Sequence, residues 1–403
     1  MKQTVGSAAP SAVEVLDYLK TRQGDMIGML EALTLAESPS DKPETQARVR
    51  ELIAERLEAE DYRTYRIPGR RSGGCLYARP AGRRRGGPVQ MMLGHYDTVW
   101  PLGTLAEIPF EVDGNIVRGP GVFDMKGGIV QMVLAVAALR HFDLEPEVAP
   151  VVFVNSDEEI GSRDSTAHIR RLAAHMNRVF VLEPSLGPEG RLKTARKGVG
   201  RFMVTVKGKA AHAGLDPEAG ASAILELSHV IQQLFALNDP EKGITVNVGT
   251  IEGGMRPNVI APESSAVIDV RVKTQTDAER IEAAIHGLKP STPQTSLEIE
   301  GGIGRPALEP TPRNRELWHV ARQLGQSLGI ELEEGLAGGG SDGNTTSLFT
   351  ATLDGLGAVG DGAHALHEFL YIDKTIERAA LLTLLLLQPP LETDPLAEPG
   401  AGQ

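Results

Sequence analysis

Residues that can bind a metal ion or move a proton recur at the ends of short apolar runs in this chain. The runs 91–94, 151–154 and 179–182 are rich in apolar residues, which predicts buried strands. Acidic and imidazole residues follow these runs or lie in loops along the chain: His95, Asp97, Asp124, Glu158, Glu159, Glu183 and His364. The carboxyl ends of parallel strands meet at one edge of a sheet, so we expect these side chains to converge there. Because imidazoles and carboxylates are zinc ligands, the set predicts a two-metal hydrolase site with a separate general base.

His95 and Asp97 are two positions apart, so on an extended segment their side chains point the same way. Asp97 can then accept a ring N–H of His95, which fixes the tautomer and the basicity of a metal-binding histidine. The alternative is a loop histidine beside an aspartate that caps a helix. The pair alone leaves both interpretations open.

The other acidic residues also have structural interpretations. Asp124 lies in a glycine-rich loop (119–128), which favours a backbone close to a ligand, but an aspartate there can also cap a helix. Glu158 and Glu159 are adjacent, so their side chains diverge, and one can act as a base while the other binds metal. As acids at the start of a helix they would only favour its dipole. Glu183 ends an apolar strand, where a carboxylate needs partners.

The composition limits the class of protein. A chain of 403 residues is expected to form two domains. Its net charge of −12 disfavours nucleic-acid binding. The single cysteine, Cys75, excludes an internal disulfide and cannot form a thiolate metal site by itself. The start of the chain lacks the apolar segment of a signal peptide, and the longest apolar stretch, 381–387, is too short to span a bilayer. We therefore expect a cytoplasmic protein without a membrane partner.

The periodicity of the chain changes near residue 198. Before it, helical patterns alternate with buried strands, which predicts an α/β domain with a mostly parallel sheet and helices on both faces. After it, half-exposed strands and two helices follow in the order βαββαβ, at 202–206, 219–237, 244–251, 266–272, 276–288 and 296–300. This is the order of a split-βαβ (ferredoxin-like) sandwich. The predicted domains are 1–196 with 307–403, and an inserted 197–306; a last strand is expected near 356–359.

Four motifs occur together in the order found in the M20 family of metallopeptidases, which the chain resembles over nearly its whole length. They are His95-Tyr96-Asp97-Thr98-Val99, the segment 119–128, Asp157-Glu158-Glu159-Ile160-Gly161 and Leu182-Glu183-Pro184. The segments 97–101 and 338–342 are typical of the glutamate carboxypeptidase (carboxypeptidase G) branch. The resemblance implies a di-metal catalytic domain and an inserted lid that also forms the interface of a homodimer.

The resemblance implies a role for each residue of the predicted metal site. The metal ligands would be His95, Asp124, Glu159, Glu183 and His364. Asp124 would bridge two zinc ions per chain, for which cobalt or manganese could substitute. Glu158 would be the general base and Asp97 the partner of His95. His367 competes with His364 for the last position, and the family's spacing to Glu368 selects His364.

Five further residues match positions that contact the substrate in this family. His212, in the lid, matches a histidine that reaches into the partner subunit's site and polarises the scissile carbonyl. Asn258, Arg305 and Gly340 would hold the free carboxylate of the departing residue, since a guanidinium can bind a carboxylate through two hydrogen bonds. Arg191 stands where the branch can place a lysine for the carboxylate of the substrate's side chain.

These matches imply a metallocarboxypeptidase, that is, a di-zinc amidohydrolase that removes a C-terminal amino acid from a peptide or an N-acyl amino acid. The resemblance implies glutamate or a similar residue as the product. The alternatives are an N-acyl amino acid deacylase, of the acetylornithine deacetylase or succinyl-diaminopimelate desuccinylase type, and a dipeptidase. A non-catalytic binding protein would lack a base or a ligand, whereas every position of the motifs is filled.

Overall fold

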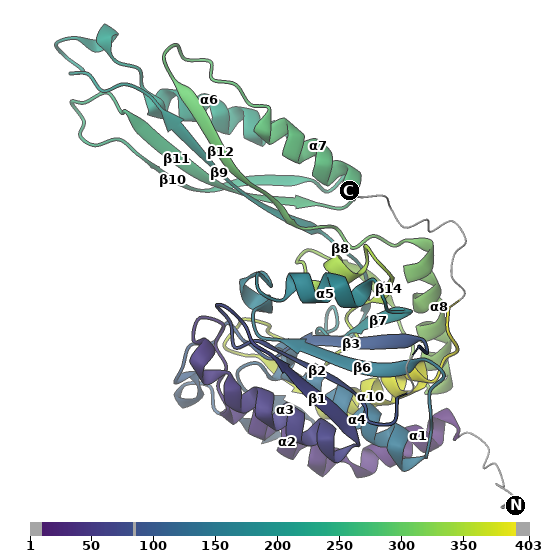
Figure 1. Ribbon diagram of the computed structural model, residues 1–403. Helices are drawn as coiled ribbons and strands as arrows, with labels where there is room; N and C mark the ends of the chain where they lie inside the picture. The colour runs from purple at the N-terminus through teal and green to yellow at the C-terminus, as the bar shows by residue number, and fades with distance from the viewer. Residues whose placement is uncertain (1–9, 84–85, 392–403) are drawn as a thin grey trace, which may run out of the picture. The chain divides into compact units, whose positions relative to one another are not determined.

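The protein consists of two compact units, described by a computed structural model over residues 10–83 and 86–391 (Figure 1). The first unit takes in the chain up to Thr194, Pro310–Gly335 and the chain from Thr345. The second takes in Ala195–Glu309 and Leu336–Asn344. It thus includes a segment, Leu336–Asn344, that the sequence prediction placed in the catalytic domain.

A six-stranded sheet forms the centre of the first unit. Its strands, in order across the sheet, are β1 (Tyr62–Ile67), β2 (Cys75–Pro80), β6 (Ala149–Asn155), β3 (Val89–His95), β7 (Arg178–Val181) and β14 (Ala351–Leu353). The strands from β6 to β14 run parallel, whereas β2 is antiparallel to its neighbours β1 and β6. Strand β3 is buried along its whole length, as expected where helices cover both faces of a parallel sheet. The prediction of a mostly parallel sheet is confirmed.

Helices cover both faces of this sheet (Figure 1). One core joins Met92 of β3 to side chains of α1 (Ala12–Thr21), α2 (Gln23–Leu35), α3 (Ala47–Ala59), α4 (Gly127–His141), α8 (Pro312–Ser327) and α10 (Ile372–Leu386). On the other face, Met91 and Leu93 pack with Ile169 of α5 (Thr166–Ala173). Since successive side chains of a strand point to opposite faces, one strand contributes to both cores.

Several shorter strands and one short helix occur along the chain between the elements named above. They are β4 (Glu111–Asp113), β5 (Ile116–Arg118), β15 (Gly360–Asp361) and β16 (Phe369–Tyr371), which form one sheet, the pair β8 (Leu192–Arg196) and β13 (Glu334–Ala337), and the helix α9 (Asp342–Thr346).

The prediction of a last strand near 356–359 is wrong, because β14 ends at Leu353. The apolar pattern there reflects burial without strand pairing. The N–H of Leu356 donates to the carbonyl of Val181, and that of Gly357 donates to the carbonyl of Glu183, beyond the end of β7. This loop therefore helps to hold the carboxyl end of β7.

The second unit is a four-stranded antiparallel sheet with two helices on one face (Figure 1). In chain order its elements are β9 (Gly198–Lys207), α6 (Ala223–Phe235), β10 (Thr245–Gly253), β11 (Glu263–Val272), α7 (Gln275–His286) and β12 (Ser296–Arg305). The strand order is β10-β11-β9-β12. The predicted βαββαβ sandwich is confirmed. Helix α6 starts after the predicted residue 219, because the Ser222 side chain caps it by accepting the N–H of Leu225.

One helical stretch, Val122–His141, is long and apolar enough to cross a membrane by length and composition alone. Its most apolar window is 94% buried inside the protein. It contains α4, which packs in the core of the first unit against α10. A buried core helix meets the same criteria of length and composition, and the packing of α4 is of that kind.

Candidate active site

The predicted metal-site residues lie at the carboxyl edge of the six-stranded sheet. His95 is the last residue of β3, Glu183 follows β7, and Glu158 with Glu159 opens the short 3-10 helix η4 (Glu158–Ile160) after β6. Asp124 lies in an irregular turn (Val122–Lys126) just before α4. These segments are far apart in the sequence, and the parallel order of β6, β3 and β7 brings their ends together.

The His95 ring lies between two groups of carboxylates. Its Nε2 is 3.3 Å from Asp124 Oδ1 and 3.5 Å from Glu183 Oε1. Its Nδ1 is 3.3 Å from Asp97 Oδ1. One nitrogen therefore faces the acidic cluster, and the other faces the aspartate that the sequence paired with it. The imidazole and the three carboxylates that face it are largely buried.

The second imidazole, that of His364, faces the same cluster from another loop. Its Nε2 is 3.1 Å from Glu159 Oε2 and 3.6 Å from Asp124 Oδ2. Asp124 thus directs Oδ1 to one imidazole and Oδ2 to the other. His367 is exposed, and its ring lies beside Gly362 instead.

Two overlapping groups of side chains have the spacing of a metal site. His95, Glu158 and Glu183 form one group, and His95, Asp124 and Glu159 form the other; the ligand atoms of each lie within 4.8 Å of one another. Asp124 Oδ1 is buried without a hydrogen-bond donor among the described residues. A divalent cation would satisfy this oxygen and offset the repulsion between the carboxylates, so the donor set fits a metal.

Without a metal ion, the carboxylates of the site favour the protonated form of the two imidazoles. Burial opposes protonation of His95, but the neighbouring carboxylates of Asp124, Asp97 and Glu183 outweigh it and raise the pKa of His95 well above its ordinary value. The hydrogen bond with Glu159 raises the pKa of His364 to about 9. Burial raises the pKa of Glu159, and the negative charge of Asp124 acts in the same direction.

Asp97 connects His95 to the turn that carries the two glutamates. Its side chain is fully buried. Oδ1 accepts the N–H of Glu158 and Oδ2 accepts the N–H of Glu159, each at 3.2 Å. Asp97 therefore faces a histidine ring and also holds the start of η4, although the N-cap residue of η4 is Asp157. Ser40 donates its hydroxyl to Asp97 Oδ2 at 2.7 Å, a contact between residues 57 positions apart that no motif signals.

Glu368 shapes the loop of Asp124. The buried carboxylate accepts the N–H of Asp124 at 3.0 Å, of Phe123 at 2.9 Å and of Gly121 at 2.8 Å, and the indole N–H of Trp100 at 2.7 Å. Burial raises the pKa of Glu368 to about 7. The alternative that Asp124 caps a helix is wrong, because α4 begins without a side-chain cap. The sequence used Glu368 only as a spacing marker.

Two predicted substrate-binding segments lie side by side in the second unit. The N–H of Ala213 donates to the carbonyl of Asn258 at 3.1 Å, and His212 pairs with Val259. His212 Nδ1 accepts the N–H groups of Gly214 at 3.2 Å and Leu215 at 3.1 Å. In the neutral ring the proton must then lie on Nε2, which makes this exposed atom a hydrogen-bond donor.

Arg305 and Gly340 also meet within the second unit. A Cβ atom at Gly340 would lie 3.1 Å from Arg305 Cδ, so the loop backbone rests on the arginine side chain. Arg305 Nη1 is 3.5 Å from Asp342 Oδ1. Arg191 belongs to the first unit and lies outside the acidic cluster, where its backbone bonds with Leu186 close a turn.

Comparisons with known proteins show which sequences this chain resembles. Residues 194–288 match the peptidase dimerisation domain of M20 enzymes. Carboxypeptidase G2 of Pseudomonas sp. is 29% identical over 291 residues, which cover 70% of this chain and 69% of that protein. The chain is therefore similar in sequence to M20 metallopeptidases. It is a hydrolase, and the resemblance predicted from the motifs is confirmed.

Solved structures of other proteins share the fold. The aminopeptidase PepT of Bacillus cereus has a TM-score of 0.74 at 17% identity, and covers 91% of this chain and 98% of its own. The YxeP protein of Bacillus subtilis, described as a dinuclear metal-binding peptidase of the M20 family, has a TM-score of 0.66 at 16% identity. It covers 91% of this chain and 98% of its own.

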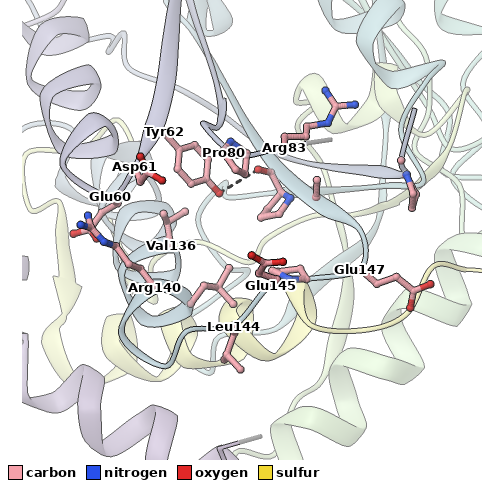
Figure 2. A pocket seen from close by; sticks show the side chains of 17 residues that line it. Glu60, Asp61, Tyr62, Pro80, Arg83, Val136, Arg140, Leu144, Glu145 and Glu147 are labelled. Atoms are coloured by element: carbon pink, nitrogen blue, oxygen red, sulfur yellow. Dashed lines mark hydrogen bonds and ion pairs between the residues drawn. The ribbon is translucent and has the colours of Figure 1, made fainter. Parts of the chain in front are cut away.

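A separate cavity of about 640 Å³ lies near the amino ends of strands β3 and β6 (Figure 2). Pro88, before β3, and Ala149 and Pro150, at the start of β6, line it. It is therefore at the amino edge of the sheet, opposite His95. Its lining combines acidic residues, two arginines and apolar side chains, and includes no histidine among the described residues. The cavity therefore plays no part in the metal-site geometry.

Proposed function

We propose that this hydrolase is a two-metal metallocarboxypeptidase that releases a C-terminal glutamate or similar residue from a peptide or an N-acyl amino acid. The observation that carries the proposal is the position of Asp124, with one oxygen 3.3 Å from His95 Nε2 and the other 3.6 Å from His364 Nε2. A carboxylate placed between two imidazoles in this way suits a ligand shared by two ions.

The side chains divide into two sets around Asp124. His95 and Glu183 would hold one zinc ion with Asp124 Oδ1, and Glu159 and His364 would hold the other with Oδ2. Bound divalent ions would polarise the scissile carbonyl and lower the pKa of water. Cobalt or manganese could replace zinc, since carboxylate-rich sites accept all three.

Glu158 is the proposed general base. A carboxylate oxygen of Glu158 belongs to the group that includes His95 and Glu183, within 4.8 Å, while the N–H of Glu158 is fixed by Asp97 Oδ1. In the reaction Glu158 takes a proton from the attacking water as the carbon–oxygen bond forms. It then gives that proton to the nitrogen as the carbon–nitrogen bond breaks, so a free amine and a carboxylate leave.

The second unit supplies the proposed substrate contacts. Arg305 and the neighbouring Gly340 backbone would bind the free carboxylate of the departing residue, with Asn258 as a further donor. The Nε2–H of His212 would stabilise the negative charge that develops on the carbonyl oxygen. We propose that His212 acts across a homodimer formed through this unit, a proposal that the dimerisation-domain match supports.

Hydrolysis of N-acyl amino acids tests this function. One series keeps the acyl group and varies the C-terminal residue; the other keeps glutamate and varies the acyl group. We expect the first series to span a far wider range of kcat/KM, with glutamate or aspartate preferred, and a chelator to abolish turnover. A rate that depends mainly on the acyl group would favour a deacylase instead.

A further inference from the structure

The glycine loop, Leu336–Asn344, is anchored to the second unit by side chains that no motif singled out. Arg196 is 3% exposed, and its Nη1 donates to the carbonyls of Gly339 at 3.3 Å and Gly340 at 3.2 Å. Its backbone pairs with Leu308 in both directions at 3.0 Å, where the chain enters and leaves the unit. The loop is thus fastened at the base of the sandwich.

Asn344 fastens the other end of the glycine loop. Its side-chain N–H₂ donates to the carbonyls of Pro306 at 2.8 Å and Lys197 at 3.2 Å. Its Oδ1 accepts the N–H of Ser341 at 2.8 Å. The Lys197 N–H in turn donates to the carbonyl of Ala337 at 3.0 Å. These bonds explain why the loop groups with the second unit although its neighbours in sequence belong to the first.

The contact with Arg196 also fixes which way one peptide group faces. The carbonyl of Gly339 and the N–H of Gly340 belong to the same trans peptide, so they point in opposite directions. With that carbonyl held by Arg196, the Gly340 N–H must point away from it. In the described part of the chain this N–H donates no hydrogen bond. It is therefore available to a ligand beside Arg305, whose Cδ lies next to Gly340.

We propose that Arg196 is a positioning residue for recognition of the substrate's free carboxylate, because it orients the Gly339–Gly340 peptide so that the Gly340 N–H and the Arg305 guanidinium bind the same anion. The proposal rests on the proposed carboxypeptidase function. It adds that the whole glycine loop belongs to the same compact unit as Arg305. Arg196 itself touches carbonyl oxygens and acts through Gly340.

A matched pair of substrates tests this role. The pair is an N-acyl glutamate and the same compound with its α-carboxylate converted to a carboxamide. In Arg196→Met we expect kcat/KM for the carboxylate to fall about tenfold to a hundredfold, mainly through KM, and the value for the carboxamide to change less than about threefold. Arg196→Lys keeps a charge and a donor, so it should recover part of the loss. An equal fall for both substrates would contradict a positioning role.

Arg201→Met is the control, because this exposed arginine lies on the same unit, in β9. It should leave kcat/KM for both substrates unchanged.

A second measurement separates the role of Arg196 from the proposed function. If the wild-type protein does not prefer the free carboxylate, the proposed function is wrong. Hydrogen exchange of the metal-loaded protein then tests the role of Arg196 by itself. The hydrogen-bonded amides of Ser341, Gly343 and Asn344 should exchange about tenfold faster in Arg196→Met, with α7 unchanged. Unchanged exchange at these three amides would overturn the inference.

Discussion

The carboxylate of Glu368 accepts the backbone N–H of Asp124 at 3.0 Å, so a buried acid holds the residue that faces both imidazoles. The same carboxylate accepts two more backbone N–H groups of this loop and the Trp100 indole. All four partners are donors, so the N–H₂ of an amide in place of this carboxylate would face another donor. The Asp124 loop therefore depends on a side chain 244 positions away.

Glu368→Gln should weaken metal binding without removing a ligand. The amide N–H₂ of glutamine would face N–H donors, so the Asp124 loop would shift. We expect metal affinity to fall about tenfold to a hundredfold, as for other residues that support metal ligands. Competition with a metal-binding dye measures this. Glu316→Gln, at an exposed position of α8, is the control, and an unchanged affinity in Glu368→Gln would show that the loop keeps its shape unaided.

Metal binding should release protons at neutral pH. In the metal-free protein the pKa of His364 is raised to about 9, so this ring is protonated at pH 7, and the raised pKa of His95 favours its protonation too. A metal ion binds the neutral ring, so apparent affinity should rise with pH from 6 to about 9 and level off above it. Calorimetry at pH 7 in buffers of different ionisation enthalpy measures the protons released. A flat affinity over this range would contradict the raised pKa values.

The two neighbouring histidines give a matched test of the second imidazole. His364→Ala should lose metal and most activity, because His364 Nε2 lies 3.1 Å from Glu159 and 3.6 Å from Asp124. His367→Ala removes an exposed ring beside Gly362 and should change metal content little. Metal analysis of the two purified variants separates them. Greater metal loss in His367→Ala would reverse the assignment.

The sequence predicted the parts of the site that depend on regular strands. The residues after β3, β6 and β7 could be placed at one edge because apolar runs mark buried strands and parallel strands end together. Ser40 and Glu368 escaped prediction, since their roles rest on loop-to-loop hydrogen bonds without a periodic signal. For the same reason the sequence assigned the glycine loop to the unit of its chain neighbours.

The pairing of the His212 and Asn258 segments shows the same limit. Each was predicted separately from a motif, whereas the backbone bond between Ala213 and Asn258 could not be read from either. The wrong strand near 356–359 shows the converse, because burial alone produced a strand-like pattern. Patterns of burial predict regular elements well, and they do not distinguish a buried loop from a strand.

Mixing two inactive variants tests whether His212 acts across a dimer. His212→Ala and Glu158→Gln should each lose most activity, the latter by about a hundredfold or more while keeping its metal. A mixed dimer would contain one site with both defects and one with neither. Random pairing makes about half of the dimers mixed, so co-refolding should restore up to about a quarter of wild-type activity. Heterodimers that form yet stay inactive would place His212 in its own chain's site, or outside catalysis.

The number of metal ions in active protein tests the central claim most directly. Metal-free protein is titrated with zinc while bound metal and turnover are measured on the same samples, for wild type and for Asp124→Asn. The account predicts full activity only at about two ions per chain, and at most one tightly bound ion in Asp124→Asn, since an amide oxygen is a poor shared ligand. Full wild-type activity at one ion per chain would contradict a site built around a carboxylate shared by two metals.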